Sequence, residues 1–110
     1  MPLALAASFD RGNVNTIGRA IASETRALGM HEILAPNLDV AREPRWGRVE
    51  ETFGEDTYLC SRFSEAAVKG YQGDGEKIEK DHIYACMKHY IAYGACIGGR
   101  DYNTSDLSLQ

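Results

Sequence analysis

The chain has 110 residues, a formal net charge of −4 and 25% charged residues. Acidic and basic side chains are interspersed rather than gathered in blocks, which argues against nucleic acid as a partner. The sequence carries no apolar run long enough to cross a membrane and no signal-peptide pattern.

The first predicted element is a helix over residues 13–28. Its apolar side chains recur near the helical period, Asp10 or Asn13 can cap its start, and Gly29 is expected to end it. After this helix, Glu32 to Leu34 is predicted to be a short buried strand of the kind found in parallel sheets.

A second helix is predicted from Asp56, a candidate N-cap, to about Lys69, with Gly70 expected to end it. A polar loop follows, and residues 83–87 are predicted to form another strand. This order of elements is typical of an α/β chain with parallel strands. A (β/α)8 barrel and a doubly wound sheet both fit it, and both bind ligands at the carboxyl ends of their strands.

Residues 39–56, between the first strand and the second helix, hold the only tryptophan, three arginines and six carboxylates. Pro44 prevents a continuous helix or an inner strand there, and Gly47 permits a tight backbone turn beside Trp46. Planar arginine donors, carboxylate acceptors and the indole face of Trp46 suit a sugar, which has hydroxyls on its edges and apolar faces. The alternative is a salt-bridged surface loop in which Trp46 covers a core.

Residues 42–48 (REPRWGR), followed by Glu51 and residues 53–56 (FGED), resemble the signature of glycoside hydrolase family 3, which includes β-glucosidases and β-xylosidases. Other blocks follow the family's order over essentially the whole chain, at residues 6–10, 35–40, 70–73, 88–90 and 98–102. Six ordered blocks are more specific than a single short motif. Residues 88–94 and 98–103 look closest to bacterial β-glucosidases of the periplasmic type.

The resemblance implies a partial (β/α)8, TIM-type barrel rather than the doubly wound sheet. A complete barrel of this kind needs on the order of 250 residues. Residues 1–110 are therefore expected to be a fragment of the family's N-terminal barrel domain, with the remainder of the barrel in a full-length parent. The parent's compartment stays open, with a periplasmic or secreted location suggested by the resemblance.

The resemblance also implies three substrate-binding residues. Arg48, the last arginine of the motif, looks like the family's sugar-binding arginine. Lys88 and His89 look like the pair that hydrogen-bonds the hydroxyls of the sugar in the −1 subsite. Glu51 is expected to orient Arg48 through an ion pair.

The activity implied by the resemblance is that of a retaining, exo-acting β-glucosidase, which hydrolyses terminal non-reducing β-D-glucosyl residues of β-glucosides or gluco-oligosaccharides without a cofactor. Such an enzyme needs two carboxylates, a nucleophile and a general acid/base. The resemblance places both beyond Gln110, and a further sugar-binding aspartate before Met1. The carboxylate pairs at residues 50–51 and 55–56 are therefore not assigned as catalytic, and the isolated chain is expected to be inactive.

Three alternatives stay open. The parent can be a β-xylosidase of the same family, or the chain can be a truncated product with only a sugar-binding or structural role. It can also belong to an unrelated barrel enzyme in which Lys88 forms a Schiff base. Arg100 and Asp101 can either line the sugar pocket or pair with each other.

Lys88 and His89 raise a geometric question, because neighbouring residues of a regular strand point to opposite faces. Both side chains can reach one sugar only if the strand loses its alternation there. We therefore predict a bend, a bulge or an unusual peptide at this position.

Cys60, Cys86 and Cys96 have neither metal-binding nor redox spacing, and they are predicted to be buried reduced thiols. Cys86 and His89 stand at a spacing seen in zinc sites, but such a site needs three or four ligands. No second pair lies at a suitable spacing, so no metal site is predicted.

Overall fold

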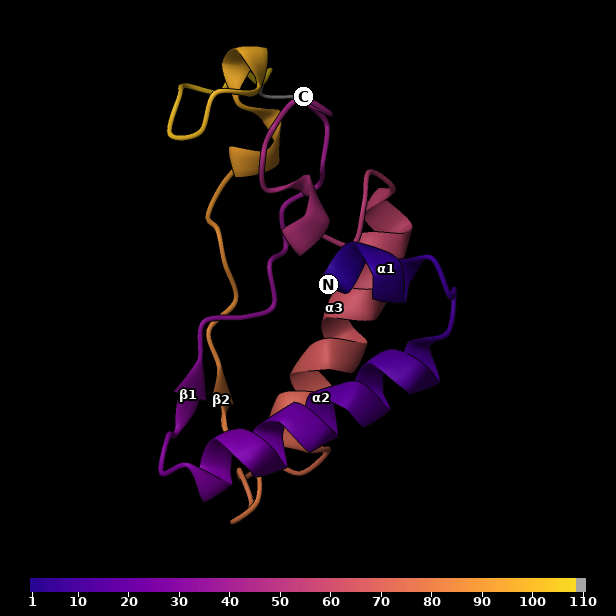
Figure 1. Cartoon of the computed structure of the whole chain (residues 1–110), viewed down its shortest axis with the longest axis vertical. Coiled ribbons are helices and arrows are strands. Elements are labelled where there is room, and N and C mark those ends of the chain that lie inside the picture. The colour runs from indigo at the N-terminus through magenta and orange to yellow at the C-terminus, as the bar shows by residue number, and fades with distance from the viewer. Residues whose placement is uncertain (109–110) are drawn as a thin grey trace.

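The computed structural model describes residues 1–108 (Figure 1). Its helices are α1 (Pro2–Ala6), α2 (Arg11–Ala27) and α3 (Thr57–Gln72), and its strands are β1 (Glu32–Ile33) and β2 (Tyr84–Ala85). Short 3-10 helices follow at Val49–Glu51, Tyr93–Ala95 and Ile97–Gly99. No described helix is both long enough and apolar enough to span a bilayer.

Helix α2 begins two residues before its predicted start. Asp10, rather than Asn13, is the N-cap, and its carboxylate accepts a hydrogen bond from the backbone N–H of Asn13 at 3.1 Å. Gly29 follows the helix with φ 82°, the left-handed conformation that glycine adopts most readily. The predicted helix is confirmed, and so is the glycine at its end.

Helix α3 begins after Asp56 as predicted, with the Asp56 carboxylate accepting from the backbone N–H of Leu59 at 2.7 Å. The prediction that Gly70 ends the helix is wrong, because α3 continues to Gln72 and Gly73 ends it with φ 81°. The helix therefore ends about one turn after Gly70.

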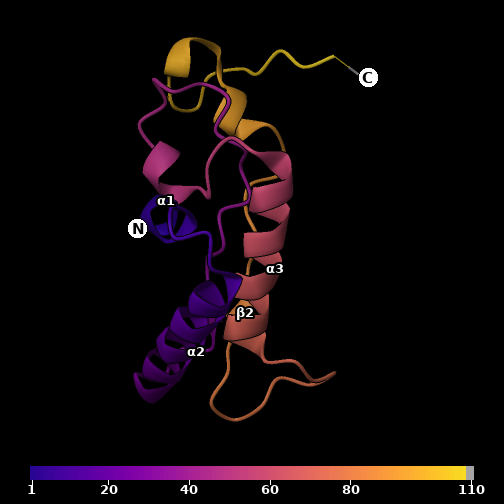
Figure 2. The ribbon, with the colours of Figure 1, turned by 90° about the vertical axis from the view of Figure 1, so that its right-hand side faces the viewer.

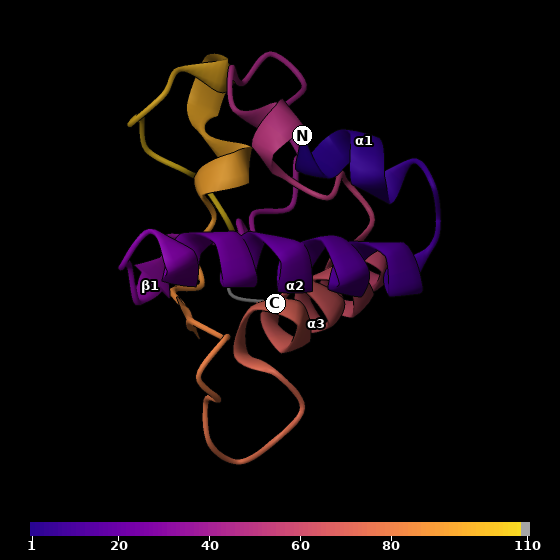
Figure 3. The ribbon, with the colours of Figure 1, turned by 60° about the horizontal axis from the view of Figure 1, so that its bottom comes forward.

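Gly70 instead allows α2 and α3 to cross at close range (Figure 3). A Cβ atom on Gly70 would lie 2.7 Å from the backbone oxygen of Asn15 and 2.9 Å from the Cα atom of Gly18. Since real Cβ atoms do not approach other atoms so closely, only glycine fits at this crossing.

The apolar core lies between α2, α3 and the segments that lead into the strands. Phe53 and Phe63 meet edge to face there, with ring centroids 5.7 Å apart. The buried cluster consists of Ala6, Val14, Ala22, Phe53, Cys60, Phe63, Ala67, Tyr71 and Ile83.

The strands are parallel, as predicted, with Glu32 opposite Tyr84, but they are shorter than predicted. Leu34 is 65% exposed, so the expectation that the first strand is buried is wrong for this position. Among the described residues, β1 and β2 pair only with each other. A parallel strand is normally covered on both faces and both edges, and this pair leaves most of that surface open.

Beyond the strands, the two segments stay together through a parallel bridge between Asn37 and Lys88. Both then lead to the end of the molecule that carries residues 39–51 and 88–105 (Figure 1). The loop at residues 73–82 projects from the opposite end (Figure 2). The candidate residues therefore gather at the carboxyl ends of the strands, where ligands bind in parallel α/β folds.

Candidate functional site

Arg48 and Glu51 form a two-point ion pair at this end of the strands. The Nε and Nη2 atoms of Arg48 donate to Oε1 and Oε2 of Glu51 at 2.8 and 2.7 Å. The Arg48 side chain is 22% exposed, so one side of the guanidinium still meets solvent. Each hydrogen bond favours the charged forms: the pKa of Arg48 is raised and that of Glu51 is lowered.

Lys88 and His89 follow the second strand, and Lys88 lines the same cavity as Glu51. Besides the Arg48 hydrogen bond, the positive charges of Arg48 and Lys88 lower the pKa of Glu51. The peptide bond between Lys88 and His89 is cis, and the bridge at Lys88 is followed by irregular backbone. Lys88 forms an isolated bridge outside the named strands and His89 lies in irregular backbone, so the predicted departure from a regular strand at this position is confirmed.

The four candidate residues do not line one cavity. Lys88 and Glu51 line a cavity of about 300 Å³, together with apolar side chains of α1 and α2. His89 lines a neighbouring cavity of about 540 Å³, beside Tyr93 and Tyr102. Glu51 thus pairs with Arg48 and shares a cavity with Lys88, whereas His89 lines a different cavity.

The carboxylate of Asp39 contacts the imidazole of His89. The Asp39 Oδ2 atom lies 2.6 Å from Nδ1 of His89, and the Asp39 side chain is only 1% exposed. The ring of Tyr93 meets the imidazole edge to face, with centroids 4.8 Å apart. Neither Asp39 nor Tyr93 was predicted to have a role, although both lie within stretches that resemble the family.

Trp46 is buried, with 2% of its surface exposed, and is not an open platform for a sugar. Its ring packs against Tyr93 with centroids 5.0 Å apart. The guanidinium of Arg48 lies 5.9 Å from the centroid of Trp46 and 5.3 Å from that of Tyr93, within reach of a cation–π attraction. Trp46 thus supports Arg48 from within the protein.

The alternative interpretation, a salt-bridged surface loop, holds for Glu43 and Arg45 of the same motif. Glu43 accepts from Nε and Nη2 of Arg45 at 2.8 Å each, and the Arg45 side chain is 72% exposed. The Arg45 hydrogen bonds lower the pKa of Glu43 to about 2. The motif therefore contains one exposed ion pair and one half-buried pair, Arg48 with Glu51.

Asp101 takes part in the packing around Arg48. It accepts from Nε1 of Trp46 at 2.9 Å and from the hydroxyl of Tyr93, while Arg100 is exposed. Within residues 1–108, Arg100 and Asp101 do not form an ion pair with each other, so that alternative is wrong.

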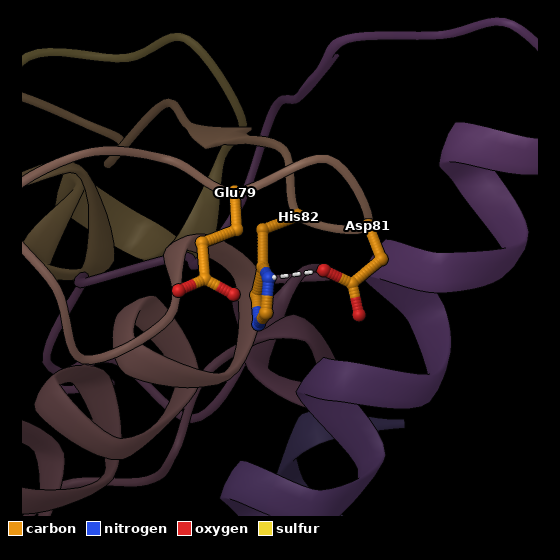
Figure 4. Close-up of side chains that lie close together, drawn as sticks. All are labelled: Glu79, Asp81 and His82. Atoms are coloured by element: carbon orange, nitrogen blue, oxygen red, sulfur yellow. Dashed lines mark hydrogen bonds and ion pairs between the residues drawn. The ribbon is translucent and has the colours of Figure 1, made fainter.

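A second cluster of polar groups lies in the loop at the far end of the molecule (Figure 4). One atom each of Glu79, Asp81 and His82 lies within 4.8 Å of the others, at distances that a metal ion could bridge. No metal site was predicted from the sequence, and this cluster contains neither Cys86 nor His89. In the structure the Asp81 carboxylate accepts a hydrogen bond from Nδ1 of His82 at 3.0 Å, which accounts for the position of the imidazole.

The cysteines are unpaired, as predicted. Cys60 and Cys96 are buried, whereas Cys86 is only partly buried, so the expectation of burial is wrong for Cys86. Burial raises the pKa of the Cys60 thiol, which favours its unreactive protonated form.

Comparisons with known proteins give a consistent result. The periplasmic beta-glucosidase of Salmonella typhimurium is 46% identical over 108 residues, which are 98% of this chain and 14% of that protein. A putative beta-xylosidase of Formosa agariphila is 40% identical over 108 residues, which are 97% of this chain and 14% of that protein.

The beta-glucosidase from Listeria innocua, crystallised in complex with glucose, matches with a TM-score of 0.94 and 47% identity, over 97% of this chain and 15% of that chain. A mutant of it was crystallised with laminaribiose. The chain thus spans about a seventh of the length of these relatives. Its fold is part of a (β/α)8 barrel, as expected, and not a doubly wound sheet. The family model for the glycosyl hydrolase family 3 N-terminal domain matches residues 1–110, and the chain belongs to that family.

Proposed function

We propose that this chain supplies part of the −1 sugar-binding subsite of a retaining, exo-acting β-glucosidase. Residues 1–110 are then a fragment of the N-terminal barrel domain of a longer enzyme. The observation that carries the proposal is the Arg48–Glu51 ion pair at the carboxyl ends of the strands, with Lys88 lining the same cavity as Glu51 and His89 following Lys88 in the chain. The β-glucosidases among the relatives support a glucosyl substrate.

The groups at this site can recognise hydroxyls by complementary hydrogen bonds. Glu51 takes Nε–H and one Nη2–H of Arg48, and the guanidinium has five N–H donors in all. Lys88 carries three further donors, and the Nε2 atom of His89 is the ring nitrogen that Asp39 does not contact. Charged donors of this kind make stronger hydrogen bonds to sugar oxygens than neutral donors do.

The catalytic carboxylates are proposed to come from outside these 110 residues. Glu51 is held ionised by Arg48 and its lowered pKa makes it a poor proton donor. The Asp39 side chain is 1% exposed, and its carboxylate is paired with Nδ1 of His89 at 2.6 Å. In the longer enzyme, the nucleophile and the acid/base would stand roughly 5 to 5.5 Å apart across the glycosidic bond.

The test is hydrolysis of p-nitrophenyl β-D-glucoside by the 110-residue chain and by the longer enzyme, each with Arg48→Ala. We expect no turnover from the chain, and turnover by the longer enzyme that falls by more than tenfold in kcat/KM with Arg48→Ala. Arg45→Ala is the matched control, because Arg45 belongs to the same motif but its side chain is 72% exposed. Turnover by the chain, or equal effects of both variants, would contradict the proposal.

A β-xylosidase is the second candidate, supported by the putative beta-xylosidase of Formosa agariphila at 40% identity. Xylose lacks the hydroxymethyl group of glucose, so the two substrates differ at one edge of the ring. The ratio of kcat/KM for the p-nitrophenyl glucoside and xyloside decides between them. A longer protein that cleaves neither would support a role restricted to sugar binding or structure.

A further inference from the structure

We propose that Asp39 is a positioning residue for His89, which fixes the orientation and the tautomer of the imidazole so that Nε2 faces the sugar. The contact between Asp39 and His89 stands by itself, whereas the identity of the group that Nε2 faces rests on the proposed function.

The contact joins residues 50 positions apart in the sequence. Asp39 follows β1 and His89 follows β2, and the bridge between Asn37 and Lys88 brings the two segments side by side. The Asp39 backbone N–H donates to Oδ1 of Asn37 at 2.8 Å, which fixes the backbone from which the carboxylate projects. The 2.6 Å separation of Oδ2 and Nδ1 is that of a strong, charge-assisted hydrogen bond.

An ionised carboxylate only accepts hydrogen bonds, so Nδ1 of His89 carries the proton in this pair. In the neutral ring, the lone pair is then on Nε2, on the side of the imidazole away from Asp39. In the protonated ring, Nε2–H is a donor on that same side. In both states, Asp39 decides which nitrogen is presented to a ligand, as carboxylates do for histidines bound to metals.

Within residues 1–108, His89 is the only hydrogen-bond partner of the buried Asp39 carboxylate. Its side chain is 1% exposed, and within residues 1–108 its second oxygen, Oδ1, has no hydrogen-bond partner. Burying a carboxylate is costly unless it is paired. The hydrogen bond with His89 offsets part of this cost. The His89 ring also packs against Tyr93, with ring centroids 4.8 Å apart.

The other two histidines of the chain serve as comparisons for His89. His82 also meets an aspartate at Nδ1, but the Asp81 side chain is 69% exposed and the separation is 3.0 Å (Figure 4). His31, the remaining histidine of the chain, is exposed. These three residues therefore report on a buried aspartate, an exposed aspartate and solvent.

The experiment reads histidine tautomers by long-range ¹H–¹⁵N correlation in the longer enzyme labelled with ¹⁵N-histidine, near neutral pH. His89→Gln assigns the His89 signals by their loss. We expect His89 to carry its proton on Nδ1, to keep it there in Asp39→Asn because the amide oxygen still accepts, and to move to the Nε2–H form in Asp39→Ala. Asp81→Ala is the control and should alter His82 alone. Unchanged His31 and His82 signals in the Asp39 variants report that the fold is retained.

A wild-type His89 in the Nε2–H form, or an Nδ1–H form that survives Asp39→Ala, would overturn the inference. The second arm measures kcat/KM for p-nitrophenyl β-D-glucoside in the longer enzyme. We expect a loss of roughly 10- to 100-fold with Asp39→Ala and a smaller loss with Asp39→Asn. A tautomer change without loss of activity would overturn the positioning role. A wild-type enzyme that cleaves no glucoside would contradict the proposed function. The tautomer measurement would still test whether Asp39 fixes the tautomer of His89.

Discussion

Asp101 accepts a hydrogen bond from the indole Nε1 atom of Trp46 at 2.9 Å, across 55 positions of sequence. The same oxygen of Asp101 accepts from the hydroxyl of Tyr93, whose ring lies between Trp46 and His89. These two hydrogen bonds lower the pKa of Asp101. One carboxylate therefore holds together two of the aromatic rings that pack around Arg48 and His89.

We predict that Asp101→Ala loosens this packing and exposes Trp46. Since Trp46 is the only tryptophan, its fluorescence reports the change directly, and its emission should shift to longer wavelength at lower denaturant than in the wild type. Arg100→Ala is the control, because Arg100 is exposed. Equal shifts in both variants would mean that the two residues act as a pair after all.

Gly70→Ala should destabilise the fold by about 1–3 kcal/mol, because its Cβ would lie 2.7 Å from the backbone oxygen of Asn15 and would push α2 away from α3. Chemical denaturation followed by circular dichroism measures the loss. Gly75→Ala is the matched control in an exposed loop, where the nearest atom to the new Cβ would be 3.5 Å away. A Gly70→Ala chain as stable as the Gly75→Ala chain would show that the crossing has room to relax.

The Arg48–Glu51 pair predicts a loss of stability in acid. The folded state lowers the pKa of Glu51, so the unfolded chain binds the proton more readily. The stabilisation is complete above the ordinary glutamate pKa of about 4.3 and disappears as the pH falls through the lower folded-state value. Thermal unfolding of the wild type and of Glu51→Gln, at several values between about pH 6 and pH 2, measures it. The difference between the two should shrink toward the acid end, and a constant difference would rule out this linkage.

Lys88→Met in the longer enzyme should lower kcat/KM for p-nitrophenyl β-D-glucoside by about tenfold to a hundredfold, the range for a lost hydrogen bond to a charged group. Lys88→Arg keeps the charge but not the shape, so it should restore only part of the activity. Borohydride treatment in the presence of a carbonyl ligand tests the Schiff-base alternative. Trapping of the ligand on Lys88 would favour that alternative over sugar binding.

The elements and contacts that depend on near neighbours could be predicted from the sequence. Asp56 caps α3 and Gly29 follows α2 because capping needs only the adjacent backbone. The pairing of Arg48 with Glu51 spans three residues and was expected from the motif. The family signature also determined the partial barrel, since six ordered blocks carry more information than the rhythm of helices and strands.

The tertiary structure alone decided the relationships between distant residues. Gly70 is a helix-packing residue rather than a helix end, because α2 happens to cross there. Asp39 meets His89, and Asp101 meets Trp46, only after the strands have aligned segments 50 and 55 positions apart. Local sequence sets backbone preference within a turn or two, whereas burial and partner choice depend on which surfaces the whole fold brings into contact.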